Sequence, residues 1–206
     1  MTDSLDGIRV LSIFWVVIGH SYIFPLQTTG QNMIVAIPEY SKQFLFTVVT
    51  SGILAVDTFF FMSGFLGAYI FMGKFKKFSV SKILIAYFHR YYRLTPILAV
   101  ILYFSTYVLY PLTTGPYRHQ TVVPNIENCA SYGWTVILYI NNFYPSLAQF
   151  TCFNWTWYLA NDMQMFLILP WVLALYTASN TIGTLFLGLL FAANFAVTFF
   201  TNYHYE

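Results

Sequence analysis

Long apolar runs limit this chain to a small set of folds. Five of them, at residues 8–24, 44–72, 83–110, 155–176 and 181–200, are expected to cross a membrane as helices. A bilayer core needs about 20 apolar residues in a helix, and it admits only helices or closed barrels. Only 8% of the 206 residues are charged, against about a quarter in a soluble domain. We therefore expect one all-α domain over residues 1–206, a polytopic transmembrane helical bundle.

The boundaries of these runs carry further expectations. The first run is expected to stop at Pro25, and the second is long enough to tilt or to begin in the membrane interface. The polar stretch 111–133 is typical of a loop. The segment "WTVILYINNFY", at 134–144, is too short to cross a bilayer. It therefore favours a short re-entrant or interfacial helix.

Basic residues indicate the orientation of the chain. Six of them lie between the second run and the first turns of the third: Lys74, Lys76, Lys77, Lys82, Arg90 and Arg93. Because Lys and Arg concentrate in cytoplasmic loops, the N-terminus and the basic loop 73–82 are expected to be cytoplasmic. The loop 111–133 is then lumenal or extracellular. The net charge of +2 gives no reason to expect a nucleic-acid partner.

The non-cytoplasmic side carries the two cysteines and one glycosylation sequon. Cys129 and Cys152 both fall where disulfides persist, so we predict a bond between them. Asn154 begins an Asn-Trp-Thr sequon. We predict that it stays unmodified, because it lies at the membrane edge, where a bulky glycan has little room.

Two polar residues stand out in the first run. Arg9 and His20 are eleven residues apart, which is about three helical turns, so they share one face and lie roughly 16 Å apart. Two interpretations of His20 remain open: a buried histidine bonded to a backbone carbonyl, or a general base, since histidine titrates near neutral pH. Arg9 alone would be an interfacial arginine, but sharing a face with His20 favours a common cavity.

The second run carries Asp57 and a pair of small residues. A carboxylate inside a membrane span must pair, protonate or line a wet cavity; a helix–helix hydrogen bond is the structural alternative. Ser63 and Gly67 form a small-xxx-small pair, which favours close helix packing over a nucleophilic role for Ser63. We nevertheless take Asp57 and Ser63 as candidate substrate-binding residues.

Later polar residues suggest two further sites. Arg90 and Arg93 are three residues apart and are expected at the cytoplasmic end of the third span. They are either membrane anchors or a clamp for phosphate, which guanidinium groups bind in a bidentate manner. Asp162 lies about two turns inside the fourth span between Asn161 and Gln164. Three such polar groups favour a functional cavity over a purely structural network.

Four of these segments together resemble a known family. They read "LDGIRVLSIFWVVIGHS", "DTFFFMSGFL", "HRYYRLTP" and "CFNWTWYLANDMQMFLILP". In this order they are similar to motifs of the membrane acyltransferase-3 family, and closest to its animal branch, the nose-resistant-to-fluoxetine-like proteins. The resemblance runs from Leu5 to about Pro170. Each motif alone is weakly specific, but four in order are specific.

The resemblance implies an acyltransferase for groups other than amino-acyl groups. The donor would be acyl-CoA, used as a substrate, with no permanently bound cofactor. The acceptor would be a hydroxyl on a lipid, sterol or glycan. His20 would be the catalytic histidine and Arg9 its motif partner, while Arg90 and Arg93 would hold the donor. Asp162 stands where bacterial relatives tend to have glutamate, so it is kept as a candidate catalytic carboxylate.

Family members usually have about twice as many spans as this chain. The resemblance therefore implies a partial domain, and we expect activity to require partner helices or a longer product.

Two other functions stay open at this stage. A non-catalytic membrane subunit or a transport-related protein could use the same scaffold, with the polar groups holding helices together or lining a conduit. A metalloenzyme is a weaker alternative, because the histidines and carboxylates lack local ligand spacing. His119 also lies in a loop away from the others, so no metal site is assigned.

Overall fold

The computed structural model describes residues 2–28, 38–40, 42–74, 79–109, 112–115, 118–145 and 152–205. The main helices are α1 (Thr2–Thr28), α3 (Phe44–Thr50), α4 (Leu54–Lys74), α5 (Val80–Tyr103), α7 (Val123–Ile137), α8 (Trp157–Ala178) and α9 (Asn180–Tyr205). Shorter helical turns occupy Ser51–Ile53, Phe104–Leu109, Arg118–Val122 and Asn154–Thr156. Within these ranges all regular structure is helical, which confirms the predicted all-α bundle.

Four helical segments are long and apolar enough to cross a bilayer. They are Phe44–Gly73, Val80–Leu109, Asn154–Ala178 and Asn180–His204, and they correspond to the second to fifth predicted spans. The first predicted span lies in α1, which has 27 residues. On its described residues α1 is not among the four apolar segments. Its crossing of the membrane therefore stays a prediction.

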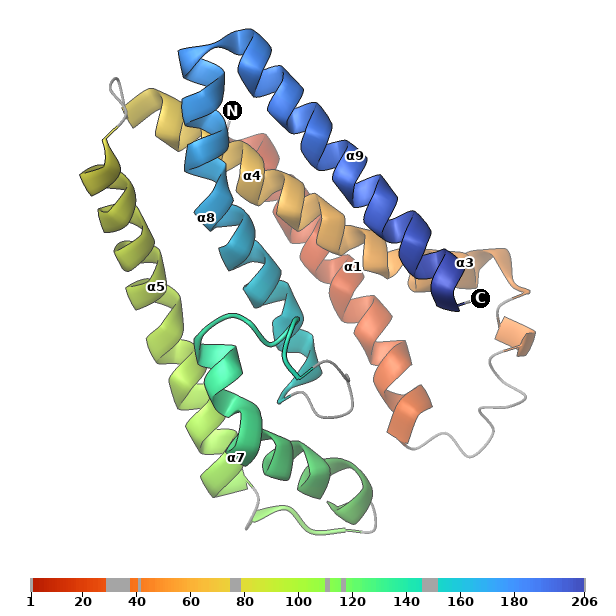
Figure 1. Ribbon diagram of the computed structural model, residues 1–206. Coiled ribbons are helices and arrows are strands. Elements are labelled where there is room, and N and C mark those ends of the chain that lie inside the picture. The colour runs from red at the N-terminus through yellow and green to blue at the C-terminus, as the bar shows by residue number, and fades with distance from the viewer. Residues whose placement is uncertain are drawn as a thin grey trace.

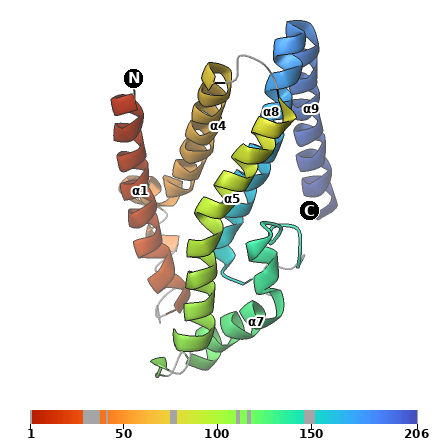
Figure 2. The ribbon, with the colours of Figure 1, turned by 90° about the vertical axis from the view of Figure 1, so that its left-hand side faces the viewer.

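The long helices extend from one end of the bundle toward the other, and α4 and α9 run obliquely to α5 and α8 (Figures 1 and 2). Figure 2 shows the N-terminus, the end of α4, the start of α5 and the turn between α8 and α9 at one end of the bundle. Helix α7 lies at the opposite end. This arrangement places residues 74 and 79 at the same end as the N-terminus, as the predicted topology requires.

Close backbone approach joins α1 to the start of α4. A Cβ atom added to Gly52 would lie 3.3 Å from the Trp15 carbonyl oxygen and 3.7 Å from the Gly19 Cα. The helices are also linked by a hydrogen bond of 2.9 Å between the Ser12 and Thr58 hydroxyls. Glycine at these positions lets α1 pack directly on the 51–58 segment.

Helix α4 packs equally closely on α8. A Cβ atom added to Gly67 would lie 2.5 Å from Leu169 Cδ2, so the glycine makes room for the leucine. The Phe60 and Tyr158 rings add a contact with centroids 4.8 Å apart. The small-xxx-small pair thus packs against a neighbouring helix as the sequence predicted.

The prediction of a polar loop over 111–133 was wrong for its second half, because α7 begins at Val123. Its inner face buries Cys129, Gly133 and Val136, which are spaced at i, i+4 and i+7. The bond between Cys129 and Cys152 is present and joins α7 to the start of α8. Polar residues on the outer face of an amphipathic helix had given the segment its loop-like composition.

The short helix expected over 134–144 is present as α7, but it lies earlier in the chain than predicted. Helix α7 already ends at Ile137, and 138–145 form a series of turns. Tyr139 adopts a left-handed backbone conformation with φ of 58°, which ends the helix and turns the chain toward α8. The buried side chains of this end form one core: Leu98, Cys129, Val136, Tyr139, Cys152, Ala160 and Met163.

Two smaller differences concern the first two runs. Helix α1 continues through Pro25 to Thr28 rather than stopping at the proline. Membrane helices tolerate proline because neighbouring groups and local adjustments satisfy the freed backbone atoms. The second run is not one straight helix, since the 3₁₀ turn Ser51–Ile53 divides it into α3 and α4.

Candidate functional site

Asp162 is the centre of a polar cluster that joins three helices. Its Oδ1 accepts a hydrogen bond of 2.7 Å from the Ser63 hydroxyl of α4. Its Oδ2 forms an ion pair with Nη2 of Arg90 from α5. The Asp162 side chain is 12% exposed and that of Arg90 23% exposed. Because a buried charge must be paired or hydrogen-bonded, this pairing accounts for both charges inside the bundle.

Arg90 lies deeper than the sequence predicted. Since α5 begins at Val80, Arg90 is ten residues along the helix, about 15 Å from its start. It lies within the helix rather than at its end, because α5 takes in Ser81 and Lys82 before the apolar run. The Arg90 guanidinium also lies over the Phe166 ring, 4.3 Å from its centroid. This cation–π contact adds to the ion pair.

The second arginine of the predicted clamp has different surroundings. Arg93 is exposed, whereas Arg90 is half-buried and bound to Asp162. In a helix, residues three apart differ by about 60° in direction, which separates the two guanidinium groups here. The structure thus places one arginine in the polar cluster and the other on the outer surface of α5.

The two predicted residues of α1 lie outside this cluster's hydrogen bonds. Arg9 pairs with Asp6 of its own helix at 3.1 Å. Nδ1 of His20 lies 2.8 Å from the Val16 carbonyl oxygen, and His20 is exposed rather than buried. A structural histidine was expected to be buried and bonded to a backbone carbonyl. His20 makes the carbonyl contact but is exposed.

Asp57 is the remaining predicted carboxylate. It lies in the first turn of α4 and is exposed. A carboxylate there is favoured by the partial positive charge at the start of a helix. Asp57 precedes Ser63 by six residues, about 9 Å along α4, so it belongs to a different level of the bundle from Asp162.

The polar neighbours of Asp162 on α8, Asn161 and Gln164, face the 138–145 turns instead of α4 and α5. Nδ2 of Asn142 donates to Asn161 Oδ1 at 2.7 Å and to Gln164 Oε1 at 3.0 Å. Nε2 of Gln164 donates to the Tyr139 carbonyl oxygen at 2.8 Å and to Asn142 Oδ1 at 2.8 Å. These contacts form an amide clamp, made of Asn142, Asn161 and Gln164, that holds the 138–145 turns against α8. Only Asp162 points into the three-helix cluster.

The sequence interpretation missed Asn142 and Phe166. The signal for Asn142 was present as two adjacent asparagines in the otherwise apolar segment "ILYINNFY". Asn141 is buried and donates to the Thr156 hydroxyl at 2.9 Å. Burial raises the pKa of Tyr139 in the same turns, and its hydroxyl lies 3.2 Å from that of Thr95. Phe166 had no comparable signal among the many phenylalanines of this chain.

A cavity of about 300 Å³ lies beside the cluster, between α4, α8 and α9. Ser63 and Asp162 are the polar side chains of its wall. The other lining residues are apolar or glycine: Phe60, Gly64, Met165, Phe166, Ile168, Leu169, Val172, Leu187 and Leu190. A volume near 300 Å³ is at the lower limit for small-molecule sites. The cavity therefore combines an apolar wall with one carboxylate.

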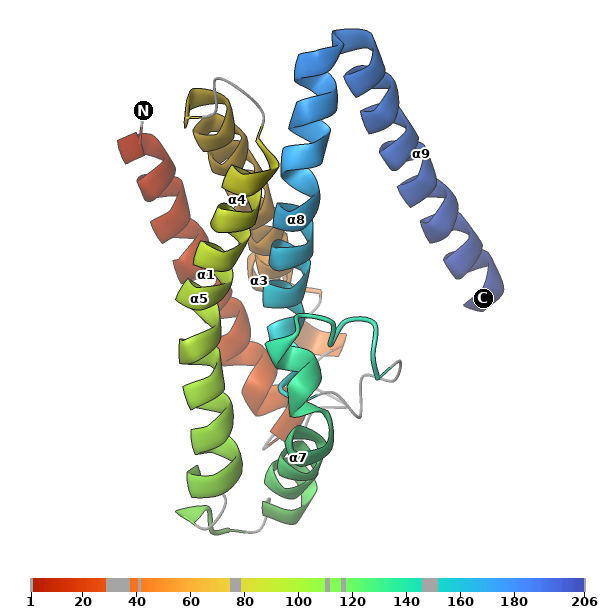
Figure 3. The same ribbon diagram turned by 60° about the vertical axis from the view of Figure 1, so that its left-hand side comes forward.

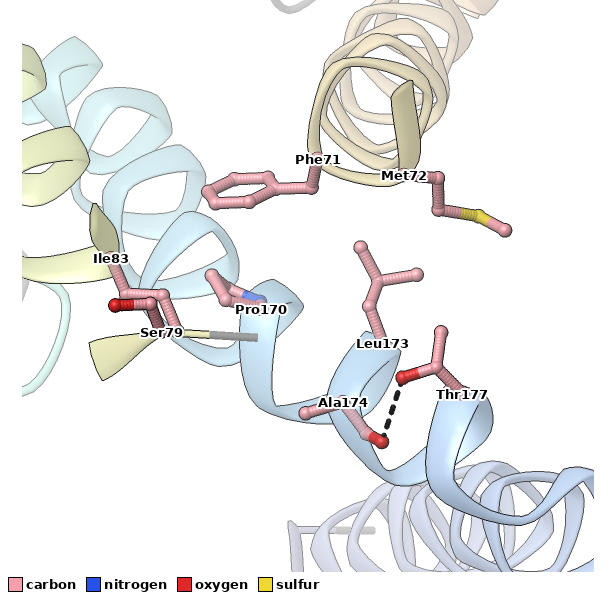
Figure 4. Close-up of a pocket in the computed structure, with 8 residues that line it drawn as sticks. All are labelled: Phe71, Met72, Ser79, Ile83, Pro170, Leu173, Ala174 and Thr177. Atoms are coloured by element: carbon pink, nitrogen blue, oxygen red, sulfur yellow. Dashed lines mark hydrogen bonds between the residues drawn. The ribbon is translucent and has the colours of Figure 1, made fainter. Parts of the chain in front are cut away.

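A second cavity, of about 60 Å³, lies between the ends of α4, α5 and α8 (Figure 4). Phe71 and Met72 face Pro170 and Leu173 across it. The Thr177 hydroxyl donates to the Ala174 carbonyl oxygen at 3.0 Å and is thereby satisfied. This space is smaller and carries no charged side chain, so we place the candidate site at the Asp162 cluster.

In the part of the chain that the structure describes, no three histidine, cysteine, aspartate or glutamate side chains gather closely enough to hold a metal ion.

Comparison with known proteins places these features in a family. A family model described as an acyltransferase domain matches residues 2–206. The chain is 33% identical over 179 residues to nose resistant to fluoxetine protein 6 of Caenorhabditis elegans. That match covers 81% of this chain but 21% of the relative, so the chain spans about a fifth of the relative's length. No solved structure matches the chain significantly. The chain belongs to the acyltransferase-3 family of membrane proteins.

Proposed function

We propose that this chain forms part of a membrane acyltransferase that moves an acyl group from acyl-CoA to a hydroxyl acceptor. In the reaction, the acceptor oxygen forms a bond to the acyl carbon and the bond from that carbon to the CoA sulfur breaks. His20 takes the proton of the hydroxyl and returns it to the thiolate, which leaves as CoA. General base action of this kind typically contributes about 10²–10⁴ in rate.

One observation carries the proposal. Ser63, Arg90 and Asp162 come from three separate segments that resemble family motifs, and their side chains meet at one buried site. The fourth segment, with Arg9 and His20, lies on α1, which packs directly on α4. Helices that bring separate motifs to one place support a shared role for them.

The proposed roles follow from charge and hydrogen bonding. Arg90 Nε is buried and has no hydrogen-bond partner within the described part of the chain. A donor left over inside the bundle suits the carbonyl oxygen of the thioester, where negative charge develops during transfer. Arg93 is exposed on the same helix and suits a phosphate of the CoA head. Asp162 holds Arg90 in place for this role.

The test measures transfer of a radiolabelled acyl group from acyl-CoA to total lipid, sterol and glycan fractions. The vesicles hold the chain together with the partner helices, or within the longer product, that its activity is expected to require. His20→Gln should abolish transfer, while the control His204→Gln, which changes an exposed histidine of α9, should retain it. Thermal unfolding of both variants checks that each remains folded. Transfer that is equal in the two folded variants would contradict a base role for His20.

A second function is favoured by a specific observation. The ion pair and the Ser63 hydrogen bond use the charges of the cluster to join three helices. That is also what a non-catalytic membrane subunit or a transport-related protein would require. Such a protein would show no labelled product with any acyl-CoA, although loss of Asp162 or Arg90 alone would still lower its stability.

A further inference from the structure

The cavity between α4, α8 and α9 has one polar corner. Ser63 and Asp162 form that corner, and the Ser63 hydroxyl already gives its proton to Asp162. An ionised carboxylate has about four acceptor sites and no proton to donate. Two of those sites on Asp162 are taken, by Ser63 and by Arg90. The corner therefore presents acceptors to a ligand and offers it no free proton.

This polarity selects among ligands. A thioester, ester or ether has only acceptor oxygens and would face the carboxylate without a hydrogen bond. A ligand with a donor fits, such as an alcohol or an amine. The charge of Asp162 is already balanced by Arg90, so a cationic amine would add an uncompensated charge inside the bundle. A neutral hydroxyl meets both conditions.

The remaining lining of the cavity favours an apolar ligand, and its position favours entry from the bilayer. Apart from the corner, the lining is hydrocarbon, aromatic ring, thioether or glycine. Met165 and Ile168 line the cavity and are 54% and 52% exposed, so the cavity is continuous with the apolar outer surface of α8. Figure 3 shows α9 diverging from α8 beyond the turn that joins them. A ligand can thus enter sideways from the hydrocarbon layer.

We propose that this cavity binds an apolar alcohol, with the hydroxyl donating a hydrogen bond to Asp162 and the hydrocarbon part lying along α8 and α9. Such an alcohol would be the acceptor of the acyl group, and this role as acceptor rests on the proposed function. The binding itself does not, because it follows from the acceptor-only corner and the apolar wall.

The test uses the whole chain in phosphatidylcholine nanodiscs and a 16-carbon alcohol that carries a photoreactive diazirine and a terminal alkyne. The matched probe is the methyl ether of the same molecule, which has lost only the donated proton. Labelled peptides are identified by mass spectrometry. Since a hydrogen bond to a charged group changes binding by about tenfold or more, the alcohol should label the α4, α8 and α9 peptides about tenfold more than the ether.

Two glycine variants make the test specific to the cavity. Gly64 lines the cavity and has open space where a Cβ would lie. Gly64→Leu should fill part of the cavity and reduce labelling about tenfold, a change that one large apolar side chain in a small site can produce. Gly188→Leu is the control, because Gly188 also has open space around it but lies on α9 away from the cavity wall.

The outcomes separate the two proposals. Equal labelling by alcohol and ether, equal labelling of the two glycine variants, or no labelling of these peptides would overturn the binding site. Labelling as expected, with no acyl transfer by the chain together with its partner helices or within the longer product, would support the binding site and contradict the proposed function. Acyl transfer to another acceptor, with no labelling by the alcohol, would overturn the binding site and leave the enzyme.

Discussion

Removing one partner of the Arg90–Asp162 ion pair should be strongly destabilising. Arg90→Leu leaves a carboxylate whose side chain is only 12% exposed. Loss of one partner from a buried pair costs about 3–5 kcal/mol. The Ser63 hydrogen bond remains, so we expect the lower end, about 3 kcal/mol, a change of roughly a hundredfold in the folding equilibrium. The Arg90→Leu/Asp162→Leu double variant should be close to the parent, because two apolar side chains can replace a buried pair.

The measurement is a double-mutant cycle on the chain in detergent micelles, with unfolding by sodium dodecyl sulfate followed by circular dichroism. Arg93→Leu is the matched control, since it removes an exposed arginine one turn further along α5 and should cost less than about 1 kcal/mol. Additive effects of the Arg90 and Asp162 changes would refute the reasoning, as would an Arg90→Leu effect no larger than that of Arg93→Leu.

Three further predictions follow from the packing and from the disulfide end. Gly67→Leu should lower stability by about 1–3 kcal/mol through overpacking. Gly64→Leu should not, because a Cβ atom at Gly67 meets Leu169 whereas one at Gly64 meets no atom within 4 Å. Equal unfolding midpoints of the two variants would contradict this. Replacing Cys129 and Cys152 with serine should lower stability by about 3 kcal/mol in the chain-entropy model, given their separation of 23 residues; unchanged unfolding would count against it. Asn154 should stay unglycosylated, because it begins a segment that is long and apolar enough to cross a membrane; a glycosidase-sensitive mass shift lost in Asn154→Gln would show otherwise.

The apolar runs predicted the long helices well, because a run of about 20 apolar residues is by itself a strong signal for a membrane-spanning helix. The fifth run, 181–200, lies inside α9, and the fourth, 155–176, nearly coincides with α8. The same reasoning failed for α7, where apolar residues occupy one face only. Its first turn contains Pro124, a residue common at the start of helices. Reading that segment by helical period rather than by overall polarity would have found it.

The candidate site was predictable in its parts and not in its assembly. Asp162 attracted attention because charged groups in apolar helices need partners, and Ser63 because it forms a small-xxx-small pair with Gly67. Their pairing joins residues 99 positions apart, and it depends on the rotation of two helices that no local pattern specifies. Arg90 was expected in the interface, because arginines near a basic loop usually lie there. Its true partner, 72 positions away, appears only when α5 and α8 are packed together.

The two faces of α8 restrict how its length can vary in related chains. Asp162 is bonded to α4 and α5, while its neighbours Asn161 and Gln164 are bonded to Asn142 on the other side. An insertion or deletion of one residue between Trp157 and Asn161 would turn these groups by about 100° relative to the disulfide end. Turning the helix back by the same angle would restore these bonds but would displace Cys152, which the disulfide fixes to Cys129. Sequences that keep both these bonds and the disulfide should therefore show a constant spacing from Cys152 to Gln164.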